Sequence, residues 1–76
     1  MPHVVISCFK AEYPMTHLER IQDEITRLLQ RELSCASAAV SVDLVPVEPD
    51  EWKDKVYLPL IVPRLEALIR KPGYSY

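Results

Sequence analysis

Pro2 is the residue whose type and position could do chemistry, because it follows Met1 at the start of an apolar, β-branched run. Removal of Met1 would leave Pro2 with a free secondary amine. An apolar pocket disfavours the cationic form of an amine and lowers its pKa towards neutrality, where the amine can act as a general base. A proline at this position can also simply stiffen the entry to a strand. The rest of the chain has to decide between these two roles.

The other reactive side chains carry no recognisable catalytic motif. His3 and His17 have no acidic or cysteine partners at ligand spacing, so we expect no metal site. We interpret His3 as a strand residue that borders a pocket. Cys8, Cys35 and the serines lack an accompanying base, which argues against nucleophilic catalysis. These residues therefore signal no metal site and no nucleophilic catalysis.

Three segments carry clear secondary-structure patterns. Residues 3–9 are mostly β-branched or aromatic and contain no turn residue, which predicts a buried strand. Residues 16–19 have the form of a capping box, and apolar side chains at helical spacing predict a helix over roughly 17–33. Residues 39–47 alternate in polarity and predict a second strand, in which Pro46 ends regular pairing or lies on an edge.

The last third of the chain has a helical pattern interrupted by prolines. Residues 49–52 combine an early proline with two acids, which is typical of a helix start. An apolar stripe at helical spacing covers 58–69, with two prolines on the opposite side. We therefore expect a secure helix only over 63–71, ended by the Pro72-Gly73 pair.

Composition narrows the class of protein. The 76 residues are enough for one domain, 1–76. Nine Lys and Arg are scattered among eleven Asp and Glu, for a formal net charge of −2, which argues against nucleic acid or an anionic membrane as partner. No apolar run is long enough to span a bilayer, and no signal-peptide pattern is present. Cys8 and Cys35 lack Cys-x-x-Cys spacing, which indicates reduced thiols and a cytoplasmic location.

The order strand, helix, strand predicts an α/β fold: a single β-α-β unit with a right-handed crossover, followed by a C-terminal helix. Two parallel strands cannot stand alone, because their faces and edges need cover. We therefore expect completion by a second copy, as a two-fold homodimer with a four-stranded sheet. Its interface should bury on the order of 2,000 Å² or more in total. Four residues outside the main stripes are candidates for this interface: Tyr57, Leu60, Tyr74 and Tyr76.

Taken together, these features resemble the 4-oxalocrotonate tautomerase superfamily, and within it the small dimeric PptA-like tautomerases. The likeness covers nearly the whole chain and rests on Met1-Pro2-His3, Cys8-Phe9, Glu51-Trp52, Glu66-Ala67-Leu68-Ile69 and Lys71-Pro72-Gly73-Tyr74-Ser75. It implies a tautomerase, an isomerase that moves a proton between the enol and keto forms of a small 2-oxo acid. It also implies that Pro2 is the general base and that no cofactor takes part.

The chain departs from the family pattern at two positions. Better-known members place one arginine in the loop after the first strand and another in the second strand, where they bind substrate carboxylate and carbonyl groups. In an ungapped alignment the corresponding positions here lie near Glu12 and at Ser41, and neither residue supplies a guanidinium group. Lys10 could replace the lost charge or be an ordinary surface lysine. Trp52 could form an apolar wall of the site or belong to the core.

These departures leave two functions open. Pro2 favours an enzyme acting on an aromatic or otherwise apolar enol acid, with Lys10, Ser41 and Trp52 as candidate substrate-binding residues. Loss of both arginines favours a non-enzymatic dimeric binding protein that keeps the fold and its pocket.

Overall fold

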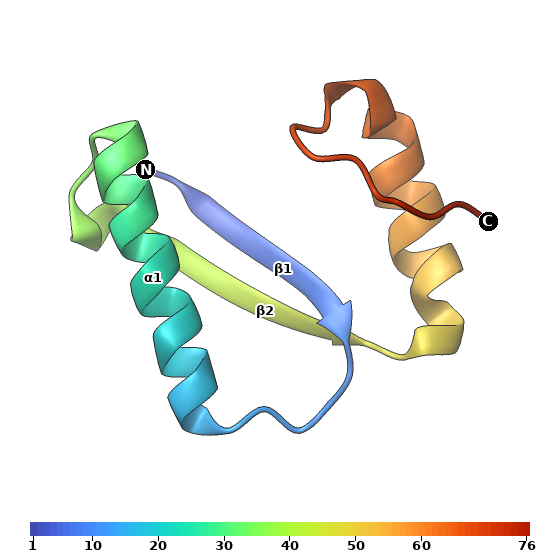
Figure 1. The fold of residues 1–76 in the computed structure, drawn as a ribbon, viewed down its shortest axis with the longest axis horizontal. Coiled ribbons are helices and arrows are strands. Elements are labelled where there is room, and N and C mark those ends of the chain that lie inside the picture. Colours follow the sequence, from blue (N-terminus) through green and yellow to red (C-terminus); the bar gives the residue numbers. More distant parts are fainter.

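A computed structural model describes the whole chain, Met1–Tyr76, and confirms the α/β fold with its β-α-β unit (Figure 1). Strands β1 and β2 run parallel and are hydrogen-bonded to each other, with His3 opposite Ser41 at one end and Phe9 opposite Val47 at the other. The elements in chain order are β1 (His3–Phe9), α1 (Met15–Leu33), η1 (Ser37–Ala39), β2 (Ser41–Val47), η2 (Pro49–Glu51), η3 (Lys53–Ile61) and η4 (Val62–Ala67).

Helix α1 packs against one face of the sheet. Ile6, Val42 and Leu44 border the space between the sheet and α1, opposite Leu18 and Ile21 of the helix. Successive side chains of a strand point to opposite faces, so the odd-numbered residues of both strands lie on the face away from α1.

The start of α1 differs from the expected capping box over residues 16–19. The helix begins at Met15 with Pro14 as its N-cap, and no side chain caps its first amides. Instead, the Pro14 carbonyl oxygen accepts hydrogen bonds from the amides of His17 and Leu18, at 2.9 and 3.3 Å. Pro14 has extended backbone angles that end the preceding connector, so Thr16 already lies inside the first turn.

Strand β2 contains Pro46 without interruption. The Ser41 amide, at the start of β2, donates to the Pro2 carbonyl oxygen at 3.1 Å. Along a parallel strand only alternate residues bond to a given neighbour, so the N–H that Pro46 lacks would point to the open edge. Of the two alternatives for Pro46, an end to regular pairing or a position on an edge, the edge position is confirmed.

The expectation of a secure helix only over 63–71 is wrong. Helical turns begin earlier, with a π-helical η3 that contains Pro59, and they end at Ala67 with a 3₁₀-helical η4. The Val62 amide donates to the Tyr57 carbonyl oxygen, five residues back. This wider turn accommodates a proline, whose ring would clash with the carbonyl four residues earlier in an α-helix. Leu68 then adopts extended angles, so the chain leaves the helix before the Pro72-Gly73 pair.

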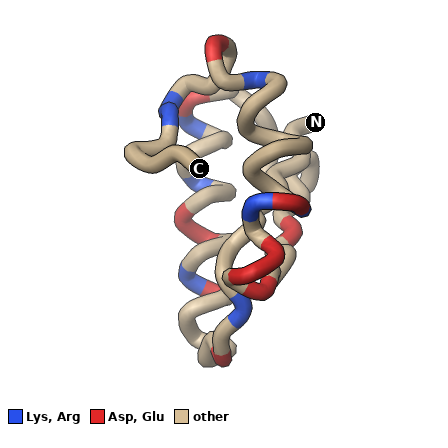
Figure 2. Tube along the Cα trace, turned by 90° about the vertical axis from the view of Figure 1, so that its right-hand side faces the viewer, with Lys and Arg blue, Asp and Glu red and all other residues tan.

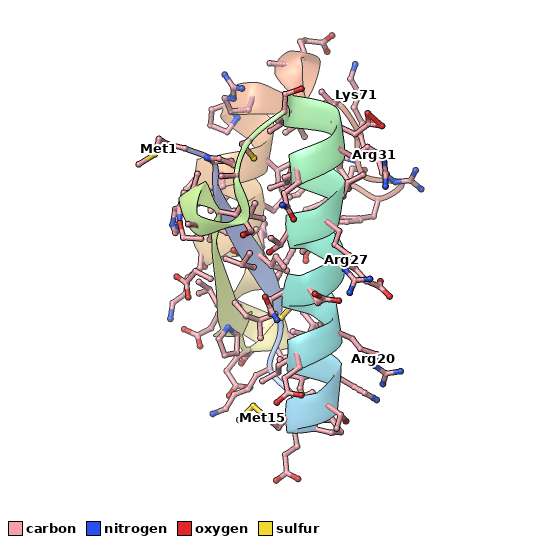
Figure 3. All side chains as sticks on the ribbon, turned by 90° about the vertical axis from the view of Figure 1, so that its left-hand side faces the viewer. Met1, Met15, Arg20, Arg27, Arg31 and Lys71 are labelled. Carbon is pink, nitrogen blue, oxygen red and sulfur yellow. The ribbon has the colours of Figure 1, made fainter.

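Positively and negatively charged residues are interspersed along the chain, as the colours of the tube in Figure 2 show. Arg20, Arg27 and Arg31 project from the outer side of α1 (Figure 3), and Arg27 pairs with Asp23 at 3.2 Å.

No helix combines the length and the apolar character that a bilayer span requires.

A single chain buries little of its apolar surface. Only Val47, Val56 and Tyr57 are buried, while Leu60 is 55% and Ile69 is 107% exposed. The accessible area is 6065 Å², against about 4,800 Å² for a folded monomer of this mass. The radius of gyration is 14.1 Å, against about 11.4 Å for a compact domain of this length.

The homodimer remains a prediction, and this excess of exposed apolar surface supports it. The prediction that Tyr57 lies at the interface is wrong, because Tyr57 is buried within its own chain. Leu60, Tyr74 and Tyr76 stay exposed.

We expect sedimentation equilibrium at micromolar concentration to give the mass of a dimer. Leu60→Asp should shift the equilibrium towards monomer, because it places a charge on exposed apolar surface. Arg20→Asp introduces the same side chain on the outer side of α1 and should leave the dimer intact. A folded, stable wild-type monomer at this concentration would contradict the prediction.

Candidate functional site

Pro2 and Ser41 lie together at the end of the sheet where both strands begin. Besides the hydrogen bond from the Ser41 amide to the Pro2 carbonyl, Ser41 Oγ lies 2.6 Å from Nδ1 of His3. Pro2 is half-buried, whereas Met1 is fully exposed and projects away from the fold (Figure 3). Ser41 therefore contacts both residues that follow Met1.

Lys10 lies at the other end of the sheet, just beyond β1. Its amide donates to the Val47 carbonyl oxygen at 2.8 Å, and its Nζ lies 3.4 Å from Oε1 of Glu48. Both charged side chains are largely exposed. Glu48 offsets the positive charge at this place, so Lys10 does not present an unpaired cation.

Trp52 also lies at this end, in the wall of an apolar cavity of about 380 Å³. Its ring meets the Phe9 ring edge-to-face, with centroids 5.3 Å apart and an interplanar angle of 86°. Its indole N–H donates to the Tyr74 hydroxyl at 2.8 Å. The cavity is lined by Phe9, Trp52, Tyr74, Ser75 and Tyr76.

The C-terminal tail is held at this cavity by tilted and edge-to-face contacts between aromatic rings. The buried Tyr57 of η3 contacts the rings of Tyr74 and Tyr76, with centroids 5.7 and 4.9 Å away. Lys53 Nζ lies 6.0 Å from the centre of the Tyr76 ring, within the range of a cation–π contact. Tyr74 and Tyr76 remain candidates for the dimer interface, and both also line this cavity, a position that we did not predict from the sequence. Their spacing of two residues was the available signal, because two residues at this spacing share one side wherever a chain runs extended.

Tyr13 closes the connector that follows β1. Its hydroxyl donates to the Phe9 carbonyl oxygen at 2.6 Å and lies 3.7 Å from Cys8 Sγ. The hydrogen bond with Cys8, and secondarily the loss of hydration, raises the pKa of the Tyr13 phenol. These contacts fix the backbone of Phe9 at the cavity.

An ion pair braces the turn that carries Trp52. Lys55 Nζ lies 2.6 Å from Oε2 of Glu51, four residues earlier. The hydrogen bond and the charge of Glu51 raise the pKa of Lys55.

One chain therefore does not bring the four candidate site residues together. Pro2 and Ser41 lie at one end of the sheet, and Lys10 and Trp52 lie at the other. Seven strand residues separate the two ends by roughly 20 Å. No cluster of three or more His, Cys, Asp or Glu side chains is placed to hold a metal ion.

No protein-family model matches the chain, but curated relatives match it from end to end. Tautomerase PptA of Klebsiella pneumoniae (strain 342) is 44% identical over 75 residues, which cover 99% of each chain. Tautomerase PptA of Pectobacterium carotovorum subsp. carotovorum (strain PC1) is 34% identical over 76 residues, the full length of both chains. Tautomerase PptA of Escherichia coli O127:H6 is 35% identical over 75 residues, again 99% of each chain. The chain thus belongs to the PptA family of tautomerases and is an enzyme of the isomerase class.

Proposed function

We propose that the enzyme interconverts the enol and keto forms of a small 2-oxo acid, with the amine of Pro2 as general base after removal of Met1. The full-length match to PptA tautomerases carries this proposal. The exposed position of Met1, which leaves room for its removal, supports it.

The chemistry requires only one basic group. The amine takes one proton from the substrate, and the resulting ammonium returns one proton at another position, so substrate and product are isomers. The two positions are related by a 1,3 or a 1,5 shift. No electrons leave the substrate, and no cofactor is consumed.

We infer that each active site combines two protomers. Two copies that pair edge to edge about a two-fold axis have antiparallel neighbouring strands. This arrangement places the Pro2 end of one protomer beside the Trp52 end of its partner. The roughly 20 Å between the two ends within one chain supports a shared site, because the apolar cavity lies out of reach of the Pro2 in its own chain.

The lining of the cavity favours a flat apolar substituent on the substrate. Phe9, Trp52, Tyr74 and Tyr76 present aromatic rings, and such rings pack against another ring at centroid distances of about 4.5–7 Å. An apolar surrounding also disfavours a protonated amine, which keeps Pro2 in its basic form. We therefore propose an aryl-substituted enol acid as substrate.

The charge pattern and the cysteines support the partners and the location that we propose. Lys and Arg are interspersed with Asp and Glu along the chain (Figure 2), and the formal net charge is −2, which argues against nucleic acid or an anionic membrane as partner. Cys8 and Cys35 are both free thiols, which supports a cytoplasmic location.

Retention of Met1 should abolish activity, because acylation turns the Pro2 amine into an amide without useful basicity. We expect the processed protein to be active, with a rate that rises with pH through an apparent pKa below the usual range of about 7.7–8.0 for a terminal amine. Intact-mass spectrometry with an enol–keto assay on both forms checks this. Equal activity of the two forms would exclude Pro2 as the base.

Aryl enolpyruvates should be turned over with a higher kcat/KM than dicarboxylate dienols, because no arginine stands at position 12 or 41 to bind a second carboxylate. A charge-assisted contact of this kind contributes about 1.5–3 kcal/mol. Ser41→Arg should therefore narrow the gap between the two substrates. Ser41→Thr, which adds no charge, serves as the control. A wild-type preference for the dicarboxylate would contradict the proposed cavity.

Mixing two defective proteins should restore activity if the site is shared. One partner carries Pro2 capped by an uncleaved N-terminal tag, and the other carries Trp52→Ala. After exchange of subunits, about one quarter of all sites would combine an intact Pro2 with an intact Trp52. If both groups came from one chain, every site would keep one defect and mixing would restore nothing.

A further inference from the structure

A side-chain hydrogen bond joins the first residues of the two strands, His3 and Ser41, and it has no role in the proposed reaction described above. His3 and Ser41 face each other in the register of the sheet, and His3 Nδ1 lies 2.6 Å from Ser41 Oγ. Both side chains are exposed, so this contact adds little to a core. It does fix the plane of an imidazole ring on the residue next to Pro2.

The contact allows two assignments of the ring nitrogens, because the Ser41 hydroxyl can donate to Nδ1 or accept a proton from it. A neutral imidazole has one donor and one acceptor nitrogen, and the partner of one nitrogen sets the role of the other. The Ser41 hydroxyl rotates freely and can donate to Nδ1. Nε2 then carries the proton, which is the more stable form of a free imidazole, and presents a donor to solvent.

We propose that His3 is a substrate-binding residue whose Nε2–H donates a hydrogen bond to the substrate carboxylate, with Ser41 as the residue that positions its ring. The proposal deepens the proposed function, on which it rests for the place of the substrate beside Pro2. Consecutive Cα atoms lie about 3.8 Å apart, so a small acid that meets the Pro2 nitrogen can reach the ring on the next residue.

This assignment explains how the site binds an acid without a guanidinium group. Ser41 occupies the position of a family arginine, and its hydroxyl is engaged by His3. A single N–H donor suits one carboxylate. Asp43 lies on the same face as Ser41, because alternate strand residues share a face, and it is exposed. Its negative charge would repel a second carboxylate, so the pair favours a monoanionic substrate.

Binding of a matched acid and amide tests the proposal without turnover. We would titrate the processed, full-length protein with 3-phenylpropanoate and with 3-phenylpropanamide in a calorimeter. His3→Leu should weaken binding of the acid by about tenfold or more and change binding of the amide less than about twofold. His3→Gln should restore much of the affinity for the acid, because its amide N–H lies near the place of Nε2.

Two further variants separate binding from positioning. Ser41→Ala should weaken acid binding less than His3→Leu does, and Ser41→Thr should preserve it. His17, the only other histidine, lies on the surface of α1. His17→Leu should therefore leave both affinities unchanged.

Nitrogen NMR of the His3 ring provides an independent readout. Two-bond ¹⁵N–¹H correlations of the neutral ring should show a proton on Nε2 and none on Nδ1, and Ser41→Ala should weaken this preference. A proton on Nδ1 overturns the proposal. So does an equal loss of acid and amide binding in His3→Leu, or a wild-type protein that does not prefer the acid. A protein that binds the acid through His3 but isomerises nothing would refute the proposed function and leave this inference standing.

Discussion

The parallel pairing of β1 and β2 is the constraint on which the rest of the structure depends. A parallel pair aligns the starts of both strands, so it brings Ser41 to Pro2 and His3 and sends Phe9 and Trp52 to the far end. It also leaves both outer edges of the sheet unpaired. The chain therefore separates its candidate base from its apolar cavity and exposes apolar surface that a second copy could cover.

The polar contacts around the candidate site contain little free positive charge. Lys10 is paired with Glu48, and Lys55 is paired with Glu51. Exposed pairs of this kind contribute little to stability, but they reduce the attraction for a dianion. What remains for recognition is the imidazole and hydroxyl at the Pro2 end. At the Trp52 end it is the aromatic rings, with the Lys53 ammonium over the ring of Tyr76. Such a site suits a ligand with one charge and one flat apolar group.

The aromatic cavity depends on the irregular C-terminal helix. The wide turn at Pro59 lets the chain remain helical from η3 into η4, and the buried Tyr57 contacts both tail tyrosines. Because the helix ends at Ala67, the following residues are free to run back as a tail. The tail then reaches Trp52, to which Tyr74 is hydrogen-bonded.

Much of the fold could be predicted from the sequence, because it depends on local patterns. Apolar periodicity identified both strands and α1 to within two residues at each end, and the β-α-β order required parallel strands. The family resemblance, carried by short segments including Met1-Pro2-His3, agreed with the full-length relatives. The start of α1 and the bounds of the C-terminal helix were harder to predict than the strands. Pro14 replaced the expected cap, and Pro59 changed the hydrogen-bonding pattern without ending the helix.

The sequence by itself determined which residue types were available: a proline next to Met1, no arginine at positions 12 and 41, and a tail rich in tyrosine. Only the tertiary structure decided which of them meet. The His3–Ser41 contact joins residues 38 positions apart, and the Trp52–Tyr74 contact joins residues 22 apart. Neither follows from a local period, because strand register and the path of the tail are set by packing between distant segments. For the same reason, the structure separates Pro2 from Trp52, which the sequence had suggested as parts of one site.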